Sequence, residues 1–298
     1  MSSIYIGIPV VHDQEFFNTI EDCLFQADNP QDIYFGVYAL CGDVFWQNRL
    51  LKFAKEIENM SLLTNPLTWQ YLGVGQGRKM AGSMYTNQDY IMSIDSHTIF
   101  GMHWDTLLKN AIEPFDDNII FTGLAGHYQS DGENRSFLPR QSKLGYPKFT
   151  GNQYKYGNDE YYTMYPEYID IHDYEEEGIM KCLLWNGNFS FSKSNFFNDL
   201  SPLPIYNETW IQTTELLNKN YKLLTPLFDY PTVAHLYGNR SIMYTHNGKS
   251  RYNYFDYLQP YELIKHQQLA YKDTWEEYKI NNPDKIKVLE EYIGVKLA

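Results

Sequence analysis

The triplet Asp95-Ser96-His97 follows an apolar run, residues 89–95, that predicts a buried strand ending on an acidic residue. If the chain stays extended beyond this strand, Asp95 and His97 point to the same side, because alternate residues of a strand share a face. A carboxylate beside an imidazole suits a divalent cation, with Mn²⁺ somewhat favoured over Mg²⁺. The triplet therefore indicates a metal site, and the alternative at this stage is an ordinary turn capped by Asp95.

The composition narrows the class of protein that carries this triplet. The net charge of −13 disfavours broad tracking along nucleic-acid phosphates, which requires clustered Lys and Arg. Three widely spaced cysteines without a CxxC pair predict free thiols in a reducing compartment. The N-terminus lacks the basic region of a signal peptide, and no apolar run approaches the roughly 18 residues of a membrane span. We therefore expect a cytoplasmic protein without a membrane partner.

The elements that position the triplet alternate between strands and helices. Apolar runs predict strands at 4–11, 32–40, 68–74, 89–95 and 118–125, and helical spacing predicts helices at 15–27, 48–60, 77–85 and 103–112. This alternation predicts βαβ units and a single Rossmann-like α/β domain, with a mostly parallel central sheet flanked by helices. Ligands of such sheets bind beyond the carboxyl ends of the strands, where Asp95 lies.

Residues 126–180 interrupt the alternation, since they are polar, Tyr-rich and weakly periodic. We expect an insertion or lid here rather than a core element. Regular structure is predicted again as a strand at 181–192, a helix at 208–220, an apolar run at 223–238 and a helical region at 275–295. The expected organisation is a main domain over 1–245 and a C-terminal helical extension over 246–298 that packs on it.

The first 90 residues contain two stretches that are similar to the motifs of one known family. Residues 4–37 follow a pattern of strand, short polar loop, TI-[DE]-D helix and P-x-x-[IV]-x-x-G-[VI]. The matching residues are Asp13 in the loop, Thr19-Ile20-Glu21-Asp22, Pro30, Gly36 and Val37. Residues 73–90 are similar to G-x-x-x-A-R-x-x-A-x-x-L-Y-x-x-E-D-Y at Gly73, Arg78, Ala81, Tyr85, Asp89 and Tyr90. The departures are His12 in place of Arg and Gly77 in place of Ala.

The most specific stretch, residues 91–105, follows Q-I-D-S-H-x-x-F-x-x-x-W-D at Ile94, Asp95, Ser96, His97, Phe100, Trp104 and Asp105. Farther along, Glu208 matches the first Glu of F-x-G-E-E, whereas Thr209 departs from the second. Residues 232–240 resemble V-x-H-x-Y-G-R and place His235 at its histidine. Over about half of its length, the chain thus resembles the cytoplasmic polypeptide N-acetylglucosaminyltransferases that modify hydroxyproline.

This resemblance implies a GT-A-type fold and a UDP-sugar donor, with GlcNAc as the expected sugar. It also implies transfer to a hydroxyl of a protein or peptide with retention of the anomeric configuration. The implied metal ligands, for Mn²⁺ or Mg²⁺, are Asp95, His97 and His235. It follows that His235 must lie within metal-bridging reach of the other two residues.

Most of the remaining site residues are also expectations that the resemblance supplies. Asp13 is expected to contact uridine, and Arg78 the ribose or diphosphate, for which a forked guanidinium is well suited. Independently of the resemblance, the place of Ser96 in the turn after the strand predicts a contact to ribose or phosphate, and Pro9 completes the expected donor-binding set. Glu208, with Asp95, is the expected catalytic residue, either steadying the acceptor or the developing oxocarbenium charge or acting as a base.

Two tryptophans allow both a functional and a structural interpretation. Trp185 and Asn186 lie where enzymes of this fold often shape the acceptor pocket, and Trp185 would suit stacking on a sugar as well as core packing. For Trp104 and the adjacent Asp105, we expect capping and packing of the 103–112 helix rather than substrate contact.

Two other functions remain open from the sequence. One is transfer to hydroxymethylated DNA bases, motivated by basic and aromatic residues interleaved over 134–155 and opposed by the net charge. The other is a non-catalytic sugar-nucleotide-binding protein, for which His12 and Thr209 are the supporting departures from the family pattern.

Overall fold

The structure, a computed structural model of the 298-residue chain, describes most of the predicted main domain. The described residues are 2–11, 13–66, 73–123, 125–130, 135–137, 178–202, 209–228, 232–236, 274–294 and 297, with the backbone of short strand segments at 146–148, 155–156, 159–160, 167–169, 245–246 and 249–250.

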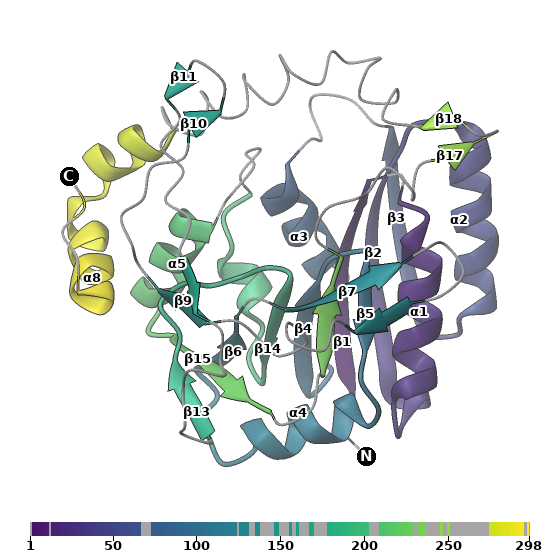
Figure 1. Cartoon of the computed structure of the whole chain (residues 1–298), viewed down its shortest axis with the longest axis horizontal. Helices are drawn as coiled ribbons and strands as arrows, with labels where there is room; N and C mark the ends of the chain where they lie inside the picture. Colours follow the sequence, from purple (N-terminus) through teal and green to yellow (C-terminus); the bar gives the residue numbers. More distant parts are fainter. Residues whose placement is uncertain are drawn as a thin grey trace.

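An eight-stranded mixed sheet forms the centre of the fold, in the order β13-β15-β6-β14-β4-β1-β2-β3 (Figure 1). Its strands are β1 (Ile4–Val11), β2 (Ile33–Cys41), β3 (Met60–Pro66), β4 (Tyr90–Ile94), β6 (Ile119–Thr122), β13 (Gly178–Lys181), β14 (Phe189–Ser192) and β15 (Lys222–Leu227). Strand β1 pairs in parallel with β2 and β4, whereas β14 is antiparallel to both β4 and β6. The predicted α/β fold is confirmed, and the antiparallel strands β13 and β14 make its sheet mixed.

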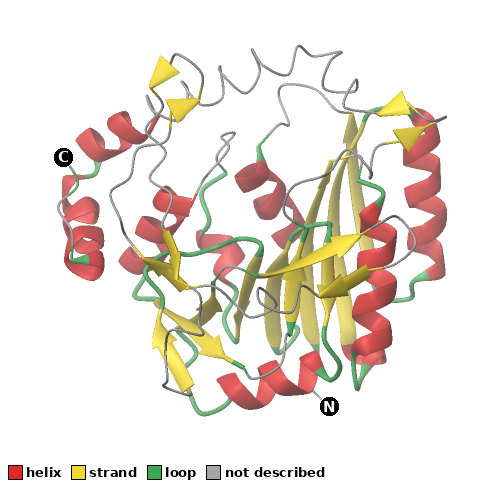
Figure 2. Ribbon diagram, viewed as in Figure 1, coloured by secondary structure: helices red, strands yellow, loops and turns green. Residues whose placement is uncertain are grey.

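Helices cover both faces of the sheet (Figure 2). They are α1 (Glu15–Gln26), α2 (Val44–Glu56), α3 (Val74–Gly82), α4 (Trp104–Ile112), α5 (Thr209–Asn218) and α8 (Pro283–Ile293), with 3₁₀ turns η1 (Pro30–Asp32) and η4 (Phe196–Asp199). No helix among the described residues is both long enough and apolar enough to cross a membrane.

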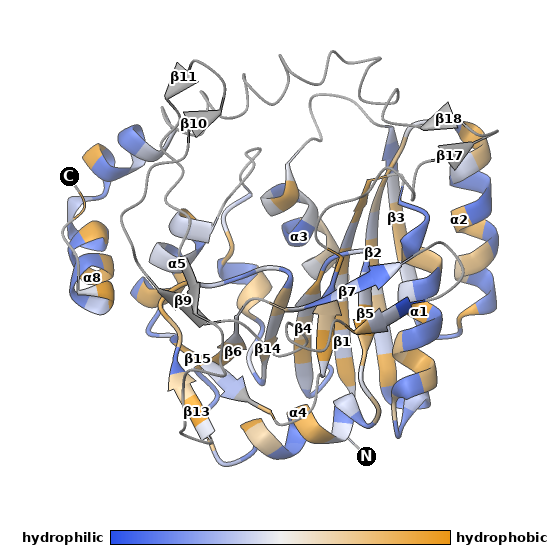
Figure 3. Ribbon diagram, in the orientation of Figure 1, coloured by the Kyte–Doolittle hydropathy of each residue, from blue (hydrophilic) through white to orange (hydrophobic). Residues whose placement is uncertain are grey.

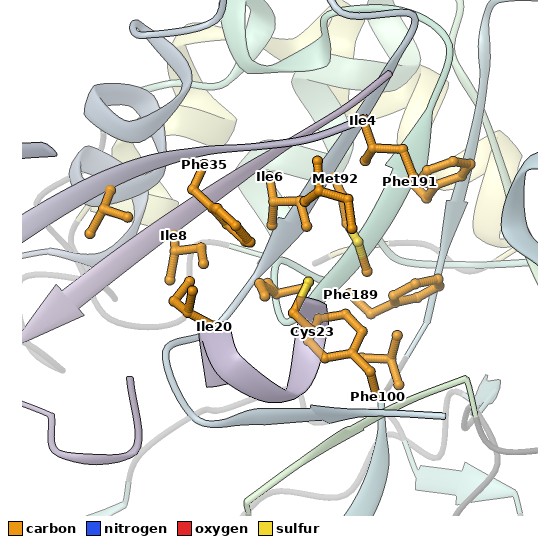
Figure 4. Packing of buried hydrophobic residues seen from close by; sticks show 14 of the residues in the cluster. Ile4, Ile6, Ile8, Ile20, Cys23, Phe35, Met92, Phe100, Phe189 and Phe191 are labelled. Carbon is orange, nitrogen blue, oxygen red and sulfur yellow. The ribbon is translucent and has the colours of Figure 1, made fainter. Parts of the chain in front are cut away.

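The two faces of β1 explain why helices are needed on both sides. Ile4, Ile6 and Ile8 enter the apolar cluster that α1, α2 and α4 cover, whereas Tyr5 enters the cluster formed with η4, α5 and α8. Figure 4 shows the first cluster, in which Ile20 and Cys23 of α1 pack against the sheet. Apolar and polar residues accordingly alternate along α1 and α2 (Figure 3), as in amphipathic helices that bury one face.

A second, four-stranded sheet contains β5 (Thr98–Phe100), β16 (Val233–His235), β7 (Gly126–Ser130) and β8 (Arg135–Phe137), in the order β5-β16-β7-β8. Strand β16 is antiparallel to β5 and parallel to β7. This small sheet joins three parts of the chain that are far apart in sequence, and β5 begins one residue after the Asp95-Ser96-His97 triplet.

Several predicted element boundaries are corrected by the structure. The third strand lies at Met60–Pro66 rather than 68–74, of which residues 68–72 lie outside the described residues. Helix α2 begins at Val44 because the Asp43 side chain accepts a hydrogen bond from the Trp46 amide at 2.7 Å and caps the helix. The strand expected at 181–192 is two strands, β13 and β14, separated by an irregular segment that contributes to the site.

Both ends of the expected insertion are ordinary parts of the fold. Residues 126–130 form β7 in the small sheet, and β13, from Gly178, pairs with β15 at one edge of the large sheet. Between them, β9 (Tyr146–Lys148) pairs with β12 (Glu167–Ile169), and β10 (Lys155–Tyr156) pairs with β11 (Asp159–Glu160). A lid role for this region stays a prediction.

The C-terminal region contains a helical stretch at 274–281 and then α8. Lys285 of α8 binds Glu215 of α5 at 2.9 Å, and Tyr278 donates a hydrogen bond to the same carboxylate at 2.7 Å. Before it, β17 (Thr245–His246) pairs with β18 (Lys249–Ser250). Because residues 251–273 lie outside the described residues, the domain boundary after residue 245 stays a prediction.

Candidate metal centre

The Asp95-Ser96-His97 triplet forms the turn between β4 and β5, and α1 holds this turn in place. Thr19 of α1 donates a hydrogen bond from Oγ1 to the Ser96 carbonyl at 2.9 Å and accepts one from the Thr98 amide at 2.9 Å. Thr98 Oγ1 donates to the Asp95 carbonyl at 2.9 Å. The turn is thus fastened on both sides of His97, which restricts the directions that the Asp95 and His97 side chains can take.

His235 reaches this turn through the small sheet. It pairs with Thr98 across β5 and β16, and the amide of the next residue, Leu236, donates to the His97 carbonyl at 3.1 Å. As a result, His235 Nε2 lies 2.9 Å from Asp95 Oδ2, and the two imidazole ring centres are 4.5 Å apart. One ligand atom from each of Asp95, His97 and His235 lies within 4.8 Å of the others. The predicted proximity of the three residues is confirmed.

The environment of the three side chains suits a cation. Both histidines are buried, and Nε2 of His97 is a buried nitrogen that has no hydrogen-bond partner among the described residues. Burying a polar nitrogen without a partner is unfavourable, so this atom is best explained by a ligand. A carboxylate with two imidazoles is a donor set for Mn²⁺ or Zn²⁺-type ions. The residues present therefore fit a divalent cation.

Arg78 of α3 lies on the opposite side of the Asp95 carboxylate from His235. Its Nη2 is 2.7 Å from Asp95 Oδ1, and its Nη1 donates to Ser93 Oγ at 3.2 Å. Burial alone would raise the pKa of Asp95, but the Arg78 guanidinium, together with His235 and His97, holds this pKa well below its usual range. Asp95 is therefore ionised at neutral pH, as a metal ligand must be.

The guanidinium of Arg78 rests against the irregular segment between β13 and β14. A Cβ atom at Gly187 would overlap the Arg78 side chain, so only glycine allows this approach. Ser93 Oγ donates to the Gly187 carbonyl at 3.0 Å and ties this segment to β4. Gly187 was missed from the sequence, although the adjacent Trp185 and Asn186 were predicted to shape the acceptor pocket.

Asp13 is buried beside His97 and is not exposed to solvent. Its carboxylate contacts His97 and Ser96 through Oδ2 and the Glu15 amide through Oδ1. Burial would raise the pKa of Asp13, but the neighbouring His97 and these hydrogen bonds lower it. Ser96, expected among the donor contacts, is also buried and directs its hydroxyl to Asp13 at 2.7 Å.

The other predicted site residues differ in how the structure places them. Pro9 lies in β1 beside Tyr38 of β2. It packs closely against α3, since a Cβ atom added at Gly77 would come within 2.9 Å of the Pro9 ring. Glu208 lies outside the described residues, so its expected catalytic role stays a prediction.

Trp185 is completely buried, and Arg78 lies over its ring at 5.9 Å. This burial favours the packing interpretation that the sequence left open, because no ring face is exposed to a sugar. Asn186 is partly buried, and its side chain accepts a hydrogen bond from the Asn188 amide at 3.2 Å. Its contact with an acceptor stays a prediction.

Trp104 and Asp105 have structural roles, as expected, but the Asp105 carboxylate binds the residues that follow α1 and not the N-terminus of α4. Trp104 is fully buried, and its indole donates to the Cys23 carbonyl at 3.0 Å. Asp105 accepts hydrogen bonds from the amides of Asp28 and Asn29 at 2.9 and 3.2 Å, beyond the end of α1. Both residues therefore fix α1 against α4, away from the metal centre.

Glu15 and Tyr128 were not anticipated from the sequence. Both are buried, and Tyr128 of β7 donates to Glu15 of α1 at 3.2 Å. Their contact links the helix that holds His97 to the sheet that holds His235. Because the surrounding segment is rich in tyrosine, the sequence does not distinguish Tyr128 from its neighbours. Only the tertiary structure shows that it links α1 to the small sheet.

Comparison with known proteins places the chain among glycosyltransferases. A family model described as "Glycosyltransferase (GlcNAc)" matches residues 49–210, more than half of the chain. A search among curated proteins gives no match.

Two solved structures match the chain. The crystal structure of GalNAc-T7 with UDP, GalNAc and Mn²⁺ matches with a TM-score of 0.57 and 12% identity, over 80% of this chain and 44% of that chain. A crystal structure of S. aureus TarS 1–349 matches with a TM-score of 0.49 and 10% identity, over 81% of this chain and 62% of that one. The chain thus spans less than half the length of GalNAc-T7, and at this identity the likeness shows the fold alone.

Proposed function

The chain belongs to the glycosyltransferase (GlcNAc) family, and from this premise we propose a metal-dependent, retaining transfer of GlcNAc from a UDP-sugar to a hydroxyl of a protein or peptide. The observation that carries the proposal is the grouping of Asp95, His97 and His235 at the end of β4. In a parallel α/β arrangement this is the edge at which ligands bind. The earlier alternative of a non-catalytic binding protein is set aside, because the family and the fold indicate an enzyme.

In this proposal, Asp95, His97 and His235 hold a divalent cation, Mn²⁺ in preference to Mg²⁺ because two of the three ligands are imidazoles. When bound, such a cation acts as a Lewis acid toward the leaving diphosphate. GalNAc-T7, which is similar in fold, was crystallised with UDP and Mn²⁺, and this supports the choice of donor nucleotide and metal.

The position of Arg78 supports the proposal that it binds the donor. Its guanidinium is buried beside Asp95 and carries a permanent positive charge next to the metal centre. A forked guanidinium forms two parallel hydrogen bonds to phosphate oxygens, so Arg78 would orient the diphosphate. Pro9 of β1 and Ser96 of the β4–β5 turn are the other proposed donor contacts.

For the acceptor, the proposal rests on the resemblance to the hydroxyproline-directed enzymes. Glu208 precedes α5 directly and is the proposed group that steadies the acceptor hydroxyl or removes its proton. Asn186 is the proposed acceptor contact on the segment between β13 and β14. Transfer to hydroxymethylated DNA has no comparable support, since the chain carries a net charge of −13.

The first test measures the binding of Mn²⁺ and UDP by the full chain, with thermal unfolding and calorimetry as the readouts. A ligand present at about 100 times its dissociation constant adds about 2.7 kcal/mol to the free energy of unfolding. The proposal expects stabilisation by UDP-GlcNAc that depends on Mn²⁺ and is lost in Asp95→Asn. His103→Asn is the matched control, because His103 is exposed and pairs with Asp28 away from the site.

The second test supplies acceptors. Hydroxyproline peptides and hydroxymethylated oligonucleotides are offered in parallel with UDP-GlcNAc and Mn²⁺, and transfer is followed by mass spectrometry. Transfer to the peptides alone supports the proposal, and transfer to the oligonucleotides alone replaces its acceptor class. If the wild-type chain binds neither Mn²⁺ nor any UDP-sugar, the proposed function is wrong.

A further inference from the structure

Resting on the proposed function, we infer that Asp13 is a positioning residue of the metal centre, which orients His97, and that it is not a contact to uridine. This assignment differs from the one that the family resemblance implies. It follows from the hydrogen bonds of a single buried carboxylate and from the nitrogen of His97 that these bonds leave available.

All the hydrogen bonds that the structure shows for the Asp13 carboxylate go to other protein groups. Oδ2 lies 2.6 Å from His97 Nδ1 and accepts a hydrogen bond from Ser96 Oγ at 2.7 Å, while Oδ1 accepts one from the Glu15 amide at 3.0 Å. Asp13 is only 2% exposed. A uracil ring would have to displace one of these partners and enter a closed space, so the carboxylate is poorly placed to bind it.

The contact with Asp13 determines which nitrogen of His97 is available to a metal. An ionised carboxylate only accepts hydrogen bonds, so the proton of His97 lies on Nδ1. In a neutral imidazole the lone pair is then on Nε2. Nε2 is buried without a hydrogen-bond partner among the described residues, and His97 belongs to the group of three possible ligands. A carboxylate behind a histidine ligand is a general means of fixing ring orientation and raising ligand basicity.

The backbone holds Asp13 where this role requires it. Asp13 lies just before α1, and its carbonyl accepts a hydrogen bond from the Phe16 amide at 3.3 Å while its side chain accepts one from Glu15. The same helix supplies Thr19, which holds the turn that carries His97. Helix α1 therefore positions both the backbone and the ring of His97.

The main alternative is that Asp13 only caps α1, and a matched variant separates the two roles. Asp105 is also a fully buried carboxylate that accepts two backbone amides beyond the other end of α1, but it does not contact the metal centre. If Asp13 only caps α1, its variants should lose stability without losing metal affinity, as Asp105→Asn should.

The experiment measures Mn²⁺ affinity by electron paramagnetic resonance titration in the wild type, Asp13→Ala, Asp13→Asn and Asp105→Asn. Loss of an outer partner of a metal ligand typically costs about 10- to 100-fold in metal affinity, which we expect for Asp13→Ala. Asp13→Asn keeps the shape and one acceptor oxygen, so it should lose less. Asp105→Asn should lower the unfolding temperature without changing Mn²⁺ affinity. UDP affinity measured without metal should be unchanged in both Asp13 variants.

The inference is overturned if the Asp13 variants bind Mn²⁺ as tightly as the wild type, or if they lose UDP affinity in the absence of metal. It is also overturned if ¹⁵N chemical shifts of the wild type, loaded with a diamagnetic divalent cation in place of Mn²⁺, place the His97 proton on Nε2. If Asp13→Ala does not fold, Asp13→Asn and the ¹⁵N measurement decide. Failure of the wild type to bind Mn²⁺ would instead contradict the proposed function.

Discussion

The two histidines of the candidate metal centre lie near Asp95 but belong to regions of the molecule that are built in different ways. His97 lies two residues from Asp95, on a turn that is held by Thr19 of α1 and by Asp13 just before that helix. His235 is 140 residues from Asp95 and arrives on the three-residue strand β16 of the small sheet. One side of the site is thus local in sequence and strongly hydrogen-bonded, and the other depends on long-range strand pairing.

This difference predicts equal effects on metal binding but unequal effects on stability. His97→Ala and His235→Ala should each reduce Mn²⁺ affinity by more than about 100-fold. This exceeds the loss of about 10- to 100-fold that is typical when a group behind a metal ligand is removed, because each variant removes a ligand itself. His97→Ala should also destabilise the protein by about 1–3 kcal/mol, because the buried Asp13 loses its closest partner. His235→Ala should cost less, since Asp95 keeps Arg78. Chemical denaturation compares the two variants, and equal losses of stability would show that both sides are held alike.

Arg78 is predicted to decide the acid stability of the site. Because the pKa of Asp95 is lowered in the folded protein, its contribution to stability is present above the unfolded pKa of about 3.9 and is lost as the pH falls below it. Arg78→Met should cost about 3 kcal/mol at neutral pH, as expected when one partner of a largely buried ion pair is removed. It should also weaken the dependence of stability on pH below 4, since the pKa of Asp95 then rises.

The matched control for this variant is Arg49→Met. Arg49 packs on the Phe17 ring at 4.0 Å and donates to the neutral side chain of Gln14. Urea unfolding at a series of pH values should show the wild-type acid dependence in this control. The same dependence in Arg78→Met would contradict the assignment of the lowered pKa to Arg78.

Gly187→Ala tests whether the segment between β13 and β14 sets the position of Arg78. The added methyl group would overlap the guanidinium and displace it. We expect UDP affinity in the presence of Mn²⁺ to fall about 10- to 100-fold, the value of one or two charge-assisted hydrogen bonds. In the background of Arg78→Ala, calorimetry should find no further loss from Gly187→Ala, because the clash has been removed. Additive losses would instead locate the defect elsewhere.

The smallest expected effect concerns Tyr128, which links the two sides through Glu15. Tyr128→Phe removes one hydrogen bond and should cost about 1 kcal/mol of stability. Because β7 pairs with β16, Mn²⁺ affinity should also fall, by less than about tenfold or 1.4 kcal/mol. Tyr221→Phe, which removes a similar bond to Asp199, should cost the same stability with no change in Mn²⁺ affinity. Equal Mn²⁺ affinities in both variants would show that the two sides act independently.

The strands and helices nearest the triplet were predictable because their patterns are local. Strand β1 is a continuous apolar run, and α1 has apolar residues at helical spacing and ends before Pro30. The boundary errors arose where long-range contacts or a capping side chain decide, as at α2 with Asp43 and at β3. The antiparallel direction of β14 has no local signature either, since strand direction depends on how the intervening chain crosses the sheet.

For the site, the sequence by itself determined the ligand chemistry: a carboxylate and an imidazole two residues apart at a strand end, with a second histidine supplied by the family resemblance. Only the tertiary structure decided how these groups act together. It joined His235 to Asp95 through β16, placed the Asp13 carboxylate beside His97, and buried Trp185 beneath Arg78. The physical reason is that residue type and spacing define which atoms can bind. Which neighbour each atom meets, and whether water can reach it, depends on contacts between distant parts of the chain.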